Sequence, residues 1–134
     1  MPSKETVSEL SNRDQAYLNL AVELAKTSQC RQRHGAVVVA GGSVIATGVN
    51  KFRNHPNVLS EYDVLLGASH HAEMVAIKQL QYRVLHNAVI YVARVNKRGI
   101  ERYSRPCNRC YPMLISHGIK EVVYTIDSVV RNMR

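Results

Sequence analysis

Two short stretches of this 134-residue sequence carry side chains that can bind a metal and move protons. The stretch SHHAEMVAI contains His71 and Glu73, separated by one alanine. The stretch RPCNRC contains Cys107 and Cys110, which stand three positions apart. Histidine and cysteine are the side chains that zinc prefers in proteins. The chemistry of the chain therefore depends on whether the two stretches meet in one site.

The cysteine spacing favours one shared zinc ion. Residues three apart lie on the same face of a helical turn, so Cys107 and Cys110 can reach one cation, and a helix start stabilises their thiolate forms. His71 is the natural third ligand. It would stand at the entry to the helix with a non-helical backbone, so that Glu73 could approach the metal without binding it. Two thiolates and one imidazole leave the fourth position of Zn²⁺ open for water, as in catalytic sites. A nearby carboxylate could take a proton from that water.

Other interpretations of the cysteines remain open. A closed structural zinc site would take Cys30 as its fourth ligand, but it would leave Glu73 without a role. A redox-active pair would leave His71 and Glu73 unexplained. We expect Cys30 to be a small buried side chain.

The apolar pattern predicts a chain of helices and strands that places both stretches at helix starts. Glycines 41 and 42 stand between two β-branched runs and predict a hairpin, because glycine tolerates the positive φ of a tight turn. Asp14 follows a helix-capping Ser11. The order is α-β-β-α-β-α-β, with helices or strands expected at 11–28, 35–40, 43–49, 72–83, 88–95, 107–118 and 120–125. Residues 51–69 form a long connection, which is often functional.

This order predicts an α/β fold in a single domain spanning 1–134. The sheet begins with an antiparallel hairpin, and crossover helices then add parallel strands, which gives a mixed sheet. The composition is that of a globular protein, with 46% hydrophobic and 21% charged residues. No stretch is typical of a signal peptide or a membrane span, and we expect a soluble cytoplasmic protein without membrane contact. The formal net charge of +8 predicts partners that carry phosphate.

The two stretches together resemble a known family. The order His71-Ala72-Glu73, then Pro106-Cys107-Asn108-Arg109-Cys110, resembles the zinc-dependent cytidine and deoxycytidylate deaminases. The strands HGAVVV and IKEVVYT, with TGVN between them, extend the resemblance over most of the chain. The residues 51–69, HAEM and PCNRC look most like deoxycytidylate deaminases and related phage-type proteins. The resemblance implies a three-layer α/β/α sandwich.

By this resemblance, His71, Cys107 and Cys110 bind Zn²⁺. Zinc-bound hydroxide would then attack C4 of cytosine, or C6 of adenine in one branch, with Glu73 as the proton shuttle. The favoured reaction converts deoxycytidylate to deoxyuridylate and ammonia. The alternatives are a deaminase acting on cytosine or adenine in single-stranded DNA or tRNA, and a noncatalytic structural-zinc module that binds nucleic acid. Relatives commonly assemble, so we also expect a homo-oligomer.

The resemblance also suggests substrate contacts. Asn50 would hydrogen-bond the sugar, and the backbone N–H groups of Ala72 and Cys107 would hold the base and the water. Independently, Arg53 in the 51–69 connection and Arg105 beside the cysteine pair could bind a phosphate, because arginine offers fixed donors.

Overall fold

The computed structural model describes residues 3–4, 10–52, 69–80, 85–106 and 110–127, in which most strands join one sheet. Neighbouring strands across this sheet are, in order, β1 (Ser3–Lys4), β8 (Ile119–Tyr124), β6 (Ala88–Val95), β2 (Arg33–Ala40) and β3 (Ser43–Val49). The short strand β7 (Glu101–Arg102) also pairs with β6, and β4 (Lys51–Phe52) pairs with β5 (Ser69–His70) in a separate ribbon.

Strand direction reverses twice across the sheet, because β2 runs opposite to both of its neighbours. β2 is antiparallel to β3 and also to β6, whereas β6 is parallel to β8 and β8 is parallel to β1. The predicted antiparallel hairpin is confirmed, although β2 begins at Arg33, two residues before the expected start. Its turn uses Gly41 and Gly42 at φ values of 60° and 77°, the left-handed region that glycine tolerates.

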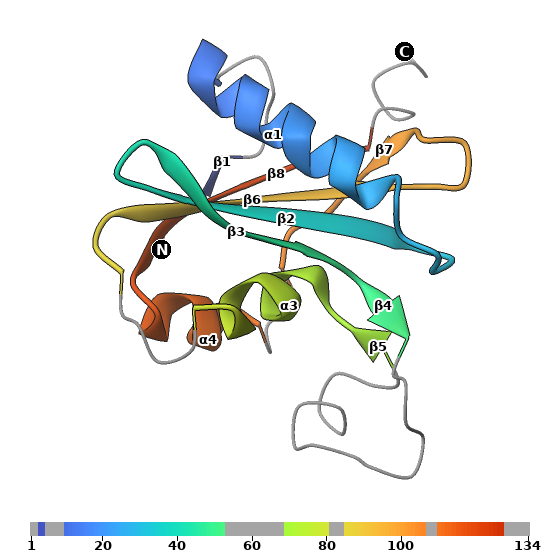
Figure 1. The fold of residues 1–134 in the computed structure, drawn as a ribbon. Helices are drawn as coiled ribbons and strands as arrows, with labels where there is room; N and C mark the ends of the chain where they lie inside the picture. The colour runs from blue at the N-terminus through green and yellow to red at the C-terminus, as the bar shows by residue number, and fades with distance from the viewer. Residues whose placement is uncertain (1–2, 5–9, 53–68, 81–84, 107–109, 128–134) are drawn as a thin grey trace, which may run out of the picture.

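Helices cover both faces of the sheet (Figure 1). Helix α1 (Asn12–Ala25) lies on one face, and helices α3 (Ala72–Lys78) and α4 (Tyr111–Ser116) lie on the other. Each face has its own apolar core, so the arrangement is a three-layer α/β/α fold. None of the helices in these described ranges is long and apolar enough to cross a membrane.

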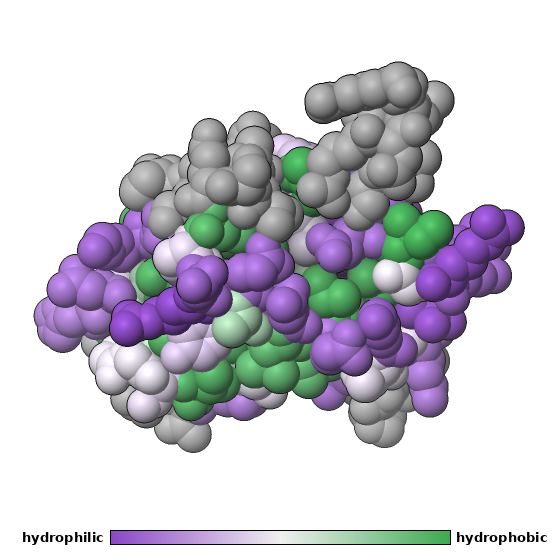
Figure 2. Space-filling view, turned by 90° about the horizontal axis from the view of Figure 1, so that it is seen from above, coloured by the Kyte–Doolittle hydropathy of each residue, from purple (hydrophilic) through white to green (hydrophobic). Residues whose placement is uncertain are grey.

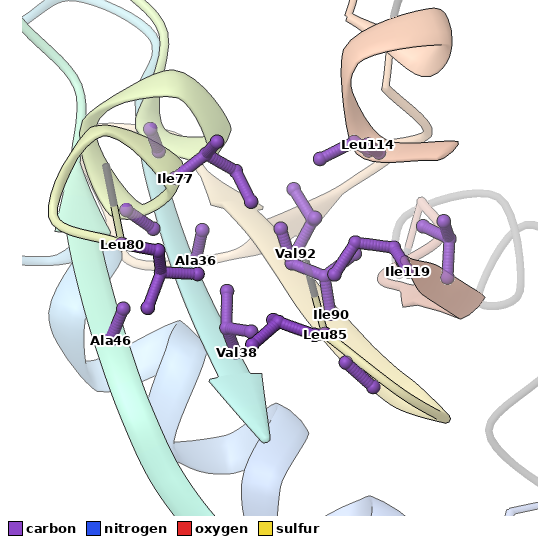
Figure 3. Packing of buried hydrophobic residues seen from close by; sticks show 14 of the residues in the cluster. Ala36, Val38, Ala46, Ile77, Leu80, Leu85, Ile90, Val92, Leu114 and Ile119 are labelled. Carbon is purple, nitrogen blue, oxygen red and sulfur yellow. The ribbon is translucent and has the colours of Figure 1, made fainter. Parts of the chain in front are cut away.

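The core beneath α3 and α4 is shown in Figure 3. Ile77 and Leu80 from the α3 side meet Val38 of β2 and Val92 of β6, and Leu114 of α4 closes the other side. Residues with even numbers on β2 and β6 face this core, because side chains alternate along a strand. The odd-numbered residues of the same strands pack against α1.

The starts of α1 and α3 agree with local sequence signals better than their ends do. The Ser11 side chain accepts a hydrogen bond from the Asp14 backbone N–H at 3.1 Å, so Ser11 caps α1 as expected. The second helix ends at Lys78 and not at about residue 83, since Gln79 caps it and its side-chain amide donates to Thr47 O.

The cysteine helix is also shorter than predicted. It begins at Tyr111, with Cys110 as N-cap, and Pro112 lies in its first turn. A proline is tolerated there because its missing N–H would have no partner in the helix. Gly118 ends the helix at a φ of 84°, as expected.

A buried polar cluster fixes the segment that leads from β7 to the cysteine pair. The Ser104 hydroxyl donates to Val92 O at 2.9 Å and lies 2.7 Å from the Thr125 hydroxyl. Thr125 in turn donates to Arg102 O and accepts from the Arg94 N–H. The segment after β7 is therefore held to β6 and to the end of β8. The short strands β1, β4, β5 and β7 were not anticipated from the sequence.

Candidate active site

The candidate site lies where α3 and α4 begin, on the same face of the sheet. His71 is the N-cap of α3 and has extended backbone angles, φ −70° and ψ 144°, as its spacing from Glu73 required. The helix comes close to β3, because Gly48 has no side chain between its backbone and the α3 residues Ala72 and Ala76. The position of His71 therefore depends on this close packing of helix and strand.

Cys110 meets His71 across the gap between the two helices. The Cys110 sulfur is fully buried and lies 3.5 Å from His71 Nδ1. A zinc ion bound by one sulfur and one imidazole nitrogen in tetrahedral geometry holds those two atoms about 3.6 Å apart, from the usual bond lengths. The observed separation fits two ligands of one zinc ion, and the donor types are those that zinc prefers.

Glu73 lies one residue beyond Ala72 in the first turn of α3, and its side chain is only 4% exposed. Burial raises the pKa of this carboxyl, while its own backbone N–H and the nearby His71 act in the opposite direction. A carboxyl that is buried beside the imidazole is suited to hold and release a proton.

The third predicted ligand, Cys107, lies outside the described residues. Among the residues that are described, no three His, Cys, Asp or Glu side chains form a group that could hold a metal ion. Cys30 therefore does not join His71 and Cys110 in such a group, which argues against the closed structural site. Cys30 is buried, 6% exposed, as expected.

Asn50 lies at the end of β3 with its side-chain amide engaged by the backbone. Its Oδ1 accepts from the His34 N–H at 2.8 Å, and its Nδ2 donates to Gln32 O and lies 3.4 Å from His34 Nδ1. The Ser28 hydroxyl donates to Asn50 O at 3.0 Å. These contacts hold Asn50 against the start of β2, on the side of the sheet that α3 covers.

The remaining predicted contacts are dispersed. Ala72 is fully buried at the start of α3. The Arg105 guanidinium lies 4.5 Å from the centre of the Tyr111 ring, a cation–π contact. Arg53 lies outside the described residues.

Two polar residues at the site had no predicted role. His34 and Arg94 are paired across β2 and β6, and both have even numbers and so face α3 and α4. Burial, together with the positive charge of Arg94 and a smaller effect of His71, lowers the pKa of His34 to about 4. The one sequence signal concerned Arg94. Its even-numbered position on β6 places a cation on the same face of the strand as the buried Ile90 and Val92.

Comparison with known protein families identifies the family of the chain. The family described as "Cytidine and deoxycytidylate deaminase zinc-binding region" matches residues 11–126, which include both stretches. The chain belongs to this family. It is therefore a zinc-dependent aminohydrolase of the cytidine and deoxycytidylate deaminase family, as the sequence resemblance implied.

Solved structures show that the fold of this deaminase family member is shared. The dCMP deaminase from the cyanophage S-TIM5 in apo form is 22% identical, covers 92% of both chains and has a TM-score of 0.64. The same enzyme in complex with dCMP and dUMP is 19% identical, covers 93% of this chain and 90% of that chain, and has a TM-score of 0.61.

A bacterial enzyme shares the fold as well. Cytidine deaminase from Mycobacterium leprae is 21% identical, covers 84% of this chain and 87% of that chain, and has a TM-score of 0.55. No curated protein matches the sequence.

Proposed function

We propose that this protein deaminates a cytosine nucleotide and that deoxycytidylate is the favoured substrate, which yields deoxyuridylate and ammonia. The observation that carries the proposal is the 3.5 Å separation between Cys110 Sγ and His71 Nδ1, with the buried Glu73 carboxyl beside them. This arrangement combines a zinc-binding pair with a proton carrier, which hydrolytic deamination requires.

In this proposal His71, Cys107 and Cys110 hold the zinc ion. When bound, zinc acts as a Lewis acid that makes a water molecule acidic enough to be a nucleophile near neutral pH. The buried thiolate of Cys110 and the neutral imidazole of His71 supply soft donors that suit this cation.

Glu73 is the proposed proton carrier. Its carboxylate accepts a proton from the attacking water and delivers it to the ring nitrogen beside the reacting carbon; it then takes the second proton from the newly added hydroxyl, which becomes the carbonyl, and delivers it to the leaving amine. Water is consumed and ammonia is released, so no other reactant is needed. Burial of the carboxyl keeps bulk water from competing for these protons.

The choice of deoxycytidylate is supported by similarity of fold. The S-TIM5 dCMP deaminase covers 92% of this chain, and one of its structures contains dCMP and dUMP. Asn50 remains the proposed sugar contact, because its fixed amide lies beside the α3 face. Arg53 and Arg105 remain proposed phosphate contacts.

We also propose that the protein forms a homo-oligomer. Large apolar side chains are exposed at separate places, including Val44 at 41% and Ile115 at 53% exposure. Sedimentation equilibrium measures the assembly directly, and a monomer at micromolar concentration would contradict this part of the proposal.

An ammonia-release assay tests the reaction and its substrate. The zinc-loaded protein is incubated separately with dCMP, dCTP, cytidine, adenosine and a single-stranded oligonucleotide, and kcat/KM is compared. We expect dCMP to give the highest value. A higher value for the oligonucleotide would replace the monomer proposal with the nucleic-acid alternative.

A substitution at Glu73 tests the mechanism. Glu73→Gln should retain one zinc per chain by elemental analysis and lose about 10²- to 10⁴-fold in kcat, because general acid–base catalysis contributes about that much. The exposed Glu23 belongs to a surface ion pair with Lys26, so Glu23→Gln is a matched control that should keep full activity. Loss of zinc from Glu73→Gln would instead make Glu73 a structural residue.

A further inference from the structure

A pocket with a cationic lining opens at the end of the sheet that carries the candidate site. It has a volume of about 480 Å³ and lies between the loop that precedes β2 and the turn that follows β6. In Figure 1 this end of the molecule is on the right, and in Figure 2 the side chains at the right edge are strongly hydrophilic. The polar lining residues are Arg31, Gln32, Arg94, Asn96, Lys97 and Arg98.

The four cations of this pocket have no anionic partner in the described parts of the chain. Arg31, Lys97 and Arg98 are exposed, while Arg94 is half-buried and its Nε atom is buried without a hydrogen-bond partner. None of the four forms an ion pair with a carboxylate among those residues. Buried donors are normally satisfied, so the Nε of Arg94 indicates a missing acceptor.

The turn that carries two of these cations is held in one conformation. The Asn96 side-chain oxygen accepts from the Arg98 N–H at 2.8 Å and from the Ile100 N–H at 3.0 Å. Gly99 completes the turn at a φ of 79°. Lys97 and Arg98 therefore extend from an ordered backbone, which reduces the entropy lost when they bind an anion.

Arg94 connects this pocket to the candidate site. It is paired with His34 across β6 and β2, and both residues lie on the side of the sheet that is covered by the helices with His71 and Cys110 as N-caps. His34 is within electrostatic reach of both Arg94 and His71. One strand spacing, about 4.8 Å, separates Arg94 from the strand of His34. The pocket thus lies on the β6 side of His34, and Arg94 in its lining faces the same side of the sheet as α3 and α4.

We propose that this pocket binds a phosphate group of the substrate and so lets the protein distinguish nucleotides from nucleosides. The inference rests on the proposed function, because it assumes that the base reaches the pair His71 and Cys110. Arginine binds phosphate through fixed parallel donors, and a phosphate dianion would offset the charge that the four cations bring together. The buried Nε of Arg94 would gain its acceptor.

Kinetics with matched substrates tests this pocket. The double variant Lys97→Gln/Arg98→Gln should lower kcat/KM for dCMP about tenfold or more, because charge-assisted hydrogen bonds to phosphate are lost, and should leave deoxycytidine unchanged. The control Arg13→Gln/Lys120→Gln removes the same charge at exposed positions elsewhere and should affect neither substrate. Equal losses for dCMP and deoxycytidine, or no loss for either, would overturn the proposal.

Two further measurements identify the source of the phosphate and distinguish a failure of the pocket proposal from a failure of the proposed function. A larger loss with a single-stranded oligonucleotide than with dCMP assigns the pocket to a nucleic-acid phosphate; the reverse assigns it to the nucleotide. Titration with inorganic phosphate, followed by backbone amide NMR, should shift the signals of Arg31 and of residues 96–98. Absence of those shifts refutes the pocket, whereas shifts without deamination of any substrate refute only the proposed function.

Discussion

Substitution of Gly48 by alanine should displace helix α3, which has His71 as its N-cap and Glu73 in its first turn. A Cβ at this position would lie 2.6 Å from Ala76 N and closer still to Ala72 O, whereas ordinary contact begins at 3.4 Å. The backbone of α3 must therefore move by at least about 0.8 Å, which carries His71 and Glu73 away from Cys110. Overpacking of this kind costs roughly 1–3 kcal/mol of folding stability, and a displacement of about 1 Å can cost about 10²-fold in rate.

The chain offers a matched control for this change. A Cβ on Gly35 would lie 2.6 Å from Ala25 N and closer still to Ala21 O, so the clash is the same but falls on α1, on the opposite face. Gly35→Ala should lose similar stability and keep its zinc site.

Urea unfolding, zinc content by elemental analysis and ammonia release from dCMP distinguish the two variants. We expect equal shifts of the urea midpoint, with a loss of zinc affinity and of kcat only in Gly48→Ala. If both variants lost stability equally and both kept full activity, the contact between β3 and α3 would not set the position of His71 and Glu73, and the reasoning would be wrong.

Two further predictions concern residues around the site. Cys30→Ser should still bind one zinc per chain by elemental analysis, since Cys30 does not join His71 and Cys110 in a metal-binding group; loss of zinc would revive the closed structural site. The pKa of His34 falls from 6.5 to about 4 on folding, so the unfolded chain binds more protons between these values and stability must decrease as pH falls through them. For the zinc-free protein this loss is up to about 3 kcal/mol at pH 4, and urea unfolding of His34→Gln should lack that part of the pH dependence; an identical pH profile in both proteins would exclude His34 as its source.

Much of the fold is predicted by local signals in the sequence. The strand at 88–95 has the expected bounds, and the hairpin turn follows from two adjacent glycines. The end of α3 could not be predicted this way. Leu80 continues the helical spacing and is buried, yet it lies in a turn, because Gln79 bonds to Thr47 of the neighbouring strand. Contacts between distant segments decided that boundary.

Part of the candidate site could also be predicted from local sequence signals. His71, Glu73 and Cys110 belong to short motifs, and their types and spacing can be recognised without a fold. Arg94 and His34 belong to strands that are not consecutive in the chain, and they face each other only because β6 pairs with β2. Their placement beside the site required the order and register of the sheet.

The Ser104 cluster has a consequence for how this protein tolerates insertions. Ser104 is bound to Val92 and Thr125, so the approach to the cysteine pair starts from a fixed point that does not depend on the path between β6 and Ser104. Residues added or removed near Lys97 would change the length of that path but would leave the anchor in place. The turn that carries Lys97 and the segment that leads to Cys110 can therefore vary in length independently of each other.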